Sequence, residues 1–248
     1  MSIKKHIPNL LTLGNLLCGT IATIFAVQGD FVSAAFLVVL GIFFDFFDGF
    51  AARLLTVSGE LGKQLDSLAD MVTSGVVPGI VMFQLLSSGN FTNGSTITET
   101  MTWVGLKFNT IQILGLLLTL AACYRLAKFN IDTRQTDSFI GLPTPAMSLF
   151  VVSLPLIVEY SDYSFITDLV QNNYFLIGVT LILSYLMNAE LPLFSLKFKN
   201  YSFKDNIQKY SFLLTSILLI ITLKFISIPL IILLYVLFSI ISNYGKKV

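Results

Sequence analysis

The sequence has few charged residues for its length. Acidic and basic side chains make up 12% of the 248 residues, whereas soluble domains carry about 25%. Hydrophobic residues make up 55% of the chain, and the mean hydropathy is +0.82. Because the apolar runs are long enough to cross a bilayer, this composition predicts an integral membrane protein rather than a soluble domain with a large core.

Cysteine, histidine and excess charge of one sign are also scarce. The two cysteines, Cys18 and Cys123, lie far apart in apolar segments, which argues against a disulfide framework or a Cys-x-x-Cys metal site. His6 is the single histidine, so imidazole ligands are in short supply. The formal net charge of +1 gives no reason to expect nucleic acid as a partner.

The apolar runs predict an all-α, polytopic integral membrane helix bundle with about eight transmembrane helices, since each span needs about 17–25 apolar residues. The expected spans are 9–28, 31–55, 61–87, 109–128, 142–160, 173–192, 210–226 and 228–244. The polar stretch 87–102 is predicted to be a loop, and the basic, aromatic stretch 197–209 a linker. The last two spans are so closely joined at Ser227 and Pro229 that they fit either a hairpin or one broken element.

The basic residues predict how these spans are oriented. With a cytosolic N-terminus, every lysine and arginine except Lys107 and Lys224 falls on the inner side, and this bias requires an even number of spans. We therefore expect both termini to face the cytoplasm, in the cell (inner) membrane. The N-terminal apolar run lacks a convincing small-x-small cleavage site, so it is predicted to be a retained first helix.

Four aspartates are concentrated in DFFDGFAARLLTVSGELGKQLDSLAD, residues 45–70. Asp45 and Asp48 are three residues apart and share a face of the second predicted helix. Asp66 and Asp70 are four apart and share a face of the third. Because a cytosolic turn joins the two helices, the four carboxylates are expected to converge in one pocket that opens to the cytosol.

Four carboxylates in one pocket need protons or cations, since each pair about 4 Å apart repels by several kcal/mol at an effective dielectric near 20. Oxygen ligands favour hard divalent ions, so we expect two cations, Mg²⁺ or Mn²⁺, which would also take phosphate oxygens of a substrate. Arg53 can reach a phosphate with its forked donors. Small residues beside the aspartates thin the helix face and let the turn approach closely; they are Gly49, Ala52, Gly59 and Gly62.

The pattern D-x2-D-G-x2-A-R-x8-G-x3-D-x3-D resembles the signature of the CDP-alcohol phosphatidyltransferases. Its eight fixed positions are matched by Asp45, Asp48, Gly49, Ala52, Arg53, Gly62, Asp66 and Asp70. The resemblance implies a six-helix membrane domain within residues 1–192, followed at 193–248 by a basic cytosolic linker and a C-terminal transmembrane pair. It also implies two-metal displacement of CMP from a CDP-linked lipid by an alcohol, in a homodimer.

The resemblance further assigns roles to individual residues. Asp45 and Asp66 would bridge both metals, Asp48 would hold the first, and Asp70 would touch the second and serve as the catalytic base. The residues expected to bind the CDP-lipid are Asn9, Thr12, Gly49, Ala52, Arg53, Gly59 and Gly62. Asn9 and Thr12 lie near a helix start, where such residues also serve as caps.

Three further stretches resemble the serine-using branch of the family: IPNLLTLGNLLCGTIA at 7–22, YRLAKFNID at 124–132 and GLPTPAM at 141–147. They imply that CDP-diacylglycerol donates the phosphatidyl group and that L-serine accepts it. Arg125 and Lys128, at the cytosolic end of the fourth span, could hold the serine carboxylate, or could simply anchor the inner face.

Two alternatives remain open. The acceptor could be glycerol 3-phosphate, an inositol phosphate or choline, which related transferases use. A cation transporter is the other alternative, but it would carry ionisable groups at mid-membrane on several helices, commonly in repeated halves. Away from residues 45–70 the predicted spans carry few acids, and no internal repeat is evident.

Overall fold

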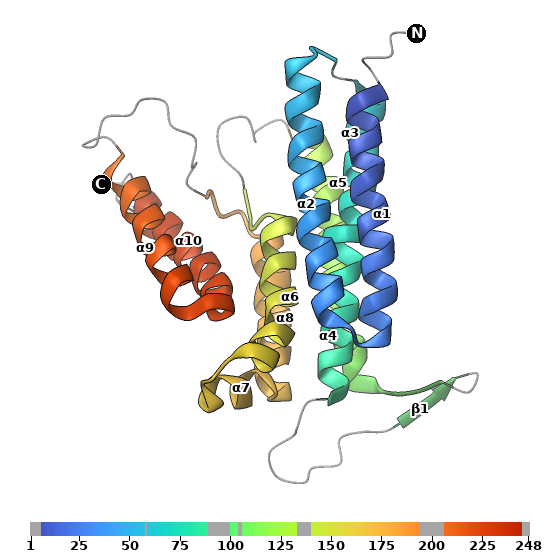
Figure 1. Cartoon of the computed structure of the whole chain (residues 1–248), viewed down its shortest axis with the longest axis vertical. Coiled ribbons are helices and arrows are strands. Elements are labelled where there is room, and N and C mark those ends of the chain that lie inside the picture. The colour runs from blue at the N-terminus through green and yellow to red at the C-terminus, as the bar shows by residue number, and fades with distance from the viewer. Residues whose placement is uncertain are drawn as a thin grey trace.

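The computed structural model describes residues 6–57, 59–88, 100–103, 106–132, 140–193 and 206–244. These residues form a bundle of long helices with a helical hairpin at one side (Figure 1). The first half of the chain contains α1 (His6–Gln28), α2 (Phe31–Leu54), α3 (Glu60–Asp70), the π-helix η2 (Met71–Val76), α4 (Val77–Ser88), β1 (Thr100–Trp103), β2 (Leu106–Asn109), the 3-10 helix η3 (Thr110–Leu116) and α5 (Leu117–Ile131). The second half contains α6 (Thr144–Tyr160), α7 (Ser164–Val170), α8 (Asn173–Asn188), α9 (Ile207–Leu223), the 3-10 turn η4 (Lys224–Ile226) and α10 (Ser227–Tyr244).

The predicted all-α membrane bundle is confirmed. Five helical runs are long and apolar enough to cross a membrane: 6–28, 31–54, 60–87, 110–131 and 207–241. The apolar helices α6 and α8 are shorter, with 17 and 16 residues. The protein is therefore an integral membrane protein, and its apolar helices lie close to the segments expected from hydropathy.

The C-terminal run is a hairpin and not a single continuous helix. It is interrupted at η4, where Lys224 has a positive φ of 48° that helical residues do not adopt. The chain reverses there, and α10 packs alongside α9 (Figure 1). This settles the choice between a hairpin and one broken element that the sequence left open.

Two predicted connections differ from the structure or fall outside it. The loop expected at 87–102 lies largely outside the described residues, but its end belongs to β1, which pairs antiparallel with β2. That part of the loop prediction is wrong, because the backbone pairing of two four-residue strands gives no apolar periodicity in the sequence. The linker expected at 197–209 also lies mostly outside the described residues, and α9 already begins at Ile207.

The centre of the fold is α6, which lies between the N-terminal helices and the C-terminal hairpin (Figure 1). Its residues from Phe150 to Ile157 are all buried. The approach to α6 is tied to the end of α8, where the Gly141 backbone N–H donates to the Leu191 carbonyl at 2.9 Å. Gly141 has a φ of +75°, and an added Cβ would lie 2.4 Å from the Met187 carbonyl oxygen, so a side chain has no room here.

The helices α1 and η2 are in backbone contact beside the aspartates. A Cβ added at Gly19 would lie 2.9 Å from both the backbone nitrogen and the Cα of Thr73. The same approach lets the Thr73 hydroxyl donate to the Asn15 carbonyl oxygen at 3.1 Å. Small residues at helix contacts in membranes commonly allow such close packing.

We predict that Gly19→Ala lowers the free energy of unfolding by about 1–3 kcal/mol, as overpacking of a tight contact does. The new methyl group meets backbone atoms, which cannot rotate away as a flexible side chain can. Unfolding of the purified protein in detergent, followed by circular dichroism against temperature or denaturant, measures the change.

Gly178→Ala in α8 is the matched control. Nothing lies within 4 Å of a Cβ added there, and alanine is the better helix former by up to about 1 kcal/mol. This variant should be as stable as the wild type or more so. Equal destabilisation by both substitutions would show that the α1–η2 contact is not especially tight.

Candidate functional site

Three aspartates from two helices form a compact acidic cluster. Carboxylate oxygens of Asp45 and Asp48 on α2 and of Asp66 on α3 all lie within 4.8 Å of one another. Asp48 is buried, with 6% exposure, and the other two are partly buried. The helical spacing of three within α2 and the return of the chain along α3 place these groups face to face.

The cluster opens into a cavity of about 410 Å³ that also contains the fourth aspartate, Asp70. The cavity is lined by Asp45, Phe46, Asp48, Gly49, Arg53, Asp66, Ser67, Asp70, Arg125, Leu126, Phe129, Pro143, Thr144 and Pro145. Its walls come from α2, α3, α5 and the start of α6. The aspartates and Arg53 come from α2 and α3, whereas α5 and the start of α6 contribute Arg125, Phe129 and a proline-flanked helix start.

Thr12 on α1 orients Asp48. The Thr12 hydroxyl lies 2.5 Å from Asp48 Oδ2, and both side chains are buried. The same hydroxyl is 3.1 Å from the Pro8 carbonyl oxygen. The hydrogen bond therefore fixes the orientation of a buried carboxylate that belongs to the acidic cluster.

Asn15, one turn further along α1, orients Asp70. Its side-chain Nδ2 donates to Asp70 Oδ1 at 3.1 Å, and Asn15 is fully buried. The π-helix η2 begins directly after Asp70 and supplies Thr73, which binds the Asn15 carbonyl. π-helical turns within α-helices occur frequently at functional sites. Asn15 is thus bonded both to Asp70 at the end of α3 and to Thr73 on η2.

Arg125 on α5 is a buried cation in the cavity wall. It is 7% exposed, and its Nε has no hydrogen-bond partner within the described part of the chain. Among the described residues, the ion pair is the one between Lys128 and Glu190. No described acidic side chain therefore lies within ion-pair distance of Arg125. Thr144, also on the cavity wall, is 1% exposed, and its hydroxyl likewise lacks a partner in the described segments. A buried polar group without a hydrogen-bond partner costs folding free energy, unless a bound ligand supplies the missing partner.

Lys128, the second residue expected to contact the acceptor, is placed differently. Its Nζ lies 2.5 Å from Glu190 Oε1. It does not line the large cavity, but it lines a small adjoining one together with Arg125 and Asn188. The structure therefore brings only one of the two predicted acceptor residues to the aspartates.

The residues expected to bind the CDP-lipid fall into two groups. Gly49 and Arg53 line the cavity directly, and Thr12 reaches it through Asp48. The others, Asn9, Ala52, Gly59 and Gly62, are not among its lining residues. Asn9 faces Gly62, since a Cβ added there would lie 3.5 Å from Asn9 Oδ1, and Gly59 is exposed with open space around it.

The sequence analysis did not single out Asn15 or Thr144. An available signal for Asn15 was its amide within a strongly apolar span, because a buried polar group in a membrane needs a partner. Thr144 carried no such signal, since a threonine at a helix start is an ordinary cap.

The donor set fits a hard divalent cation. Asp45, Asp48 and Asp66 offer carboxylate oxygens close enough to share an ion, and neither imidazole nor thiolate occurs among the residues that line the cavity. Oxygen-only ligands of this type suit Mg²⁺ and Mn²⁺. The cavity has room for a phosphate group beside the cluster, with Arg53 on its rim.

Comparison with known proteins agrees with this geometry. The sequence profile of the CDP-alcohol phosphatidyltransferase family matches residues 5–186. The chain is 33% identical over 150 residues to a CDP-diacylglycerol–serine O-phosphatidyltransferase of Bacillus subtilis (strain 168), covering 60% of this chain and 75% of that protein.

Two further relatives are similar over comparable lengths. A protein of the same name from Helicobacter pylori (strain J99) is 34% identical over 148 residues, 58% of this chain and 55% of the relative. The archaetidylserine synthase of Methanothermobacter thermautotrophicus is 30% identical over 162 residues, 64% of this chain and 61% of the relative. The profile match covers most of the chain and includes the whole acidic cluster, so this protein belongs to the CDP-alcohol phosphatidyltransferase family.

Proposed function

We propose that the protein transfers the phosphatidyl group of CDP-diacylglycerol to the hydroxyl of L-serine and releases CMP. The observation that carries the proposal is one cavity that contains both the aspartate cluster and the buried Arg125, whose Nε has no hydrogen-bond partner in the described chain. The relatives from Bacillus subtilis and Helicobacter pylori are named for this reaction, which supports serine as the acceptor.

The reaction is an in-line displacement at the lipid-linked phosphorus. The serine hydroxyl oxygen forms the new bond to this phosphorus, the bond from phosphorus to the CMP oxygen breaks, and the hydroxyl proton passes to Asp70. Asn15 holds Asp70 Oδ1 at 3.1 Å, so it fixes the carboxylate for that transfer. Asp70 acts through its position, because a carboxylate held beside the acceptor hydroxyl can take its proton in the transition state.

The aspartates and Arg53 prepare the donor. Asp45, Asp48, Asp66 and Asp70 would hold the divalent cations, which neutralise the diphosphate and stabilise the leaving CMP. Thr12 keeps Asp48 turned toward the cluster. Arg53, exposed at the cavity rim, pairs with the diphosphate, and Gly49 leaves space for it.

Arg125 explains the preference for an amino acid acceptor. The Nε of this buried guanidinium lacks a hydrogen-bond partner in the described chain, and the serine carboxylate can supply one through two parallel hydrogen bonds. A phosphorylated acceptor would need more positive charge. The cations that line the cavity are Arg53 and Arg125, while Lys128 is paired with Glu190.

The catalytic unit is residues 1–192, and residues 193–248 are an accessory pair of helices with their linker. All residues that line the cavity precede residue 146, and the family match ends at residue 186. The distribution of lysine and arginine supports a cavity that opens to the cytoplasm, where serine is available. Family membership supports a homodimer in the cell membrane.

An acceptor panel tests the proposed reaction. Purified protein with CDP-diacylglycerol and Mg²⁺ should release CMP with L-serine and form phosphatidylserine, but not with glycerol 3-phosphate, an inositol phosphate or choline. CMP release and lipid chromatography measure the outcome. Efficient release with another acceptor would assign the protein to a different branch of the family.

Metal removal is the control within the same assay. A chelator should abolish CMP release, and Mg²⁺ or Mn²⁺ should restore it. Full activity in a metal-free preparation would contradict a metal-dependent mechanism.

Asp70→Asn should reduce serine transfer by roughly 10²–10⁴-fold, the usual contribution of a positioned base. CDP-lipid binding should persist, because Asp45, Asp48 and Asp66 remain in place. Single-turnover kinetics and binding of the CDP-lipid measure the two effects separately.

Asp45→Asn provides the comparison for this variant. Asp45 belongs to the three-carboxylate cluster, so its loss should weaken metal and CDP-lipid binding together. Near-normal turnover of Asp70→Asn would mean that another group removes the serine proton.

Arg125→Ala should raise the serine concentration needed for half-maximal rate about tenfold or more, since a charge-assisted hydrogen bond contributes about 1.5–3 kcal/mol. The affinity for CDP-lipid should change little. Arg125→Lys keeps the positive charge but loses the forked guanidinium, so its serine requirement should lie between those of the wild type and Arg125→Ala.

Lys128→Ala separates the two residues predicted to contact the acceptor. Because Lys128 pairs with Glu190 outside the cavity, this substitution should affect the serine requirement less than Arg125→Ala does. A larger effect of Lys128→Ala would place the carboxylate site in the smaller adjoining cavity.

A further inference from the structure

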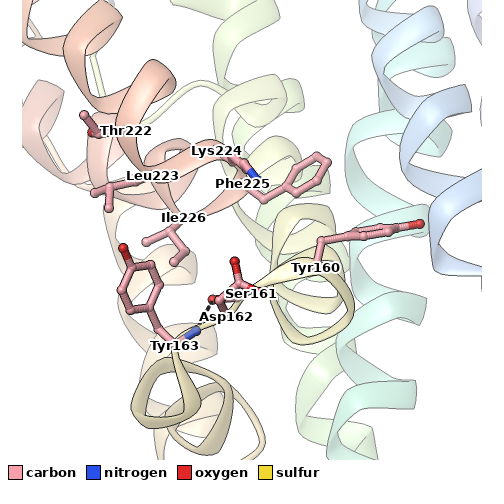
Figure 2. A pocket seen from close by; sticks show the side chains of 9 residues that line it. All are labelled: Tyr160, Ser161, Asp162, Tyr163, Thr222, Leu223, Lys224, Phe225 and Ile226. Atoms are coloured by element: carbon pink, nitrogen blue, oxygen red, sulfur yellow. Dashed lines mark hydrogen bonds between the residues drawn. The ribbon is translucent and has the colours of Figure 1, made fainter.

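A second pocket lies where the C-terminal hairpin meets the core (Figure 2). It has a volume of about 210 Å³. One wall is the connection from α6 to α7, residues 160–163, and the other is the turn from α9 to α10, residues 222–226. None of these residues has a part in the proposed transfer reaction.

This pocket is at the opposite end of the bundle from the aspartates. Helix α6 begins with Thr144 at the aspartate cavity and ends with Tyr160 at the second pocket. At 1.5 Å per residue the two ends are roughly 25 Å apart, which is close to the thickness of the hydrocarbon core of a membrane. The second pocket therefore opens at the other membrane surface.

Charges of opposite sign stand on the two walls. Asp162 belongs to the α6–α7 connection and Lys224 to the hairpin turn, and Figure 2 shows these segments facing each other. Within the described part of the chain the two side chains form no ion pair with each other, since the ion pair found there joins Lys128 and Glu190. A cation and an anion held apart across a pocket are complementary to a ligand that carries both charges.

Lys224 has an unusual backbone conformation at the turn between α9 and α10. Its φ of 48° is one of two positive values at non-glycine residues in the described chain. Such a conformation at a lysine is unfavourable and persists where the surrounding structure holds it. Here the Ser227 hydroxyl donates to the Lys224 carbonyl oxygen, and the buried Ile226 anchors the turn.

The remaining lining residues match a membrane surface. Tyr160 and Tyr163 are half-exposed, and the Tyr160 ring lies 5.5 Å from that of Phe225. Amphipathic aromatic residues are typical of the level of lipid headgroups. Beside the pocket, Ile220 and Ile221 on α9 expose 54% and 73% of their surface, so an apolar chain can lie along this helix.

We propose that this pocket binds the headgroup of a zwitterionic phospholipid with a primary ammonium, such as phosphatidylethanolamine. Lys224 contacts the phosphate, Asp162 accepts hydrogen bonds from the ammonium, and the acyl chains lie along α9. A serine headgroup would add a carboxylate beside Asp162, and a glycerol headgroup would leave Asp162 without a cation. The bound lipid joins the hairpin to the α6–α7 connection and stabilises that contact.

Native mass spectrometry of the detergent-purified chain tests the proposal, with phosphatidylethanolamine and phosphatidylglycerol of equal acyl chains. The wild type should retain phosphatidylethanolamine more tightly. Asp162→Asn and Lys224→Gln should each weaken its binding about tenfold, which corresponds to about 1.4 kcal/mol. Lys224→Gln should also weaken phosphatidylglycerol, whereas Asp162→Asn should not.

Lys209→Gln is the matched control, because it removes the same charge from the other end of α9. It should leave lipid selectivity unchanged. CMP release by every variant should stay near the wild-type value, which shows that the chain is folded and separates this proposal from the proposed reaction. Soluble phosphoethanolamine should bind much more weakly than the lipid, since it lacks acyl chains.

Equal retention of the two lipids by the wild type would overturn the proposal even if a variant failed to fold. Unchanged phosphatidylethanolamine binding in both charge variants would overturn it as well. Binding of soluble phosphoethanolamine as tight as that of the lipid would show that the pocket recognises a soluble metabolite.

Discussion

The mutual repulsion of the aspartate carboxylates is the constraint on which the rest of the site depends. Carboxylates this close in a partly buried cavity repel strongly and are poorly solvated. Three of them nevertheless lie within 4.8 Å of one another. The fold tolerates this because it provides donors behind the carboxylates and leaves an open space in front of them for cations.

Helix α1 provides most of that support without entering the cavity. Thr12 and Asn15 are three residues apart, so they share one face and reach Asp48 on α2 and Asp70 on α3. This arrangement requires α1 to lie very close to both helices. Gly41 permits the approach of α2, and Gly19 permits that of η2, which continues α3. The first helix therefore acts as a template that sets the distance between the two acidic helices.

Much of the architecture could be predicted from the sequence because hydropathy and charge are averaged over many residues. The spans, the shared faces of the aspartates and the family signature all follow from spacing along the chain. Contacts between distant segments could not be predicted in this way. The pairing of Asn15 with Asp70 links residues 55 positions apart, and the pairing of Lys128 with Glu190 links residues 62 apart. The sequence places Arg125 and Lys128 on one helix end, but tertiary packing lets only Arg125 line the aspartate cavity, while both residues line the smaller one.

The π-helix after Asp70 has a consequence for how the third span can vary. A π turn takes up more residues than an α turn, so it shifts the angular phase of everything that follows it. The segment from Glu60 to Ser88 is thus one continuous helix in two parts, a polar part up to Asp70 and an apolar part from Val77, and the π-helix sets their relative rotation. Loss of one residue between them would leave the helix intact and rotate α4 against its neighbours. The π-helix thereby lets α4 pack against its neighbours independently of α3, whose orientation places Asp66 and Asp70 at the cavity.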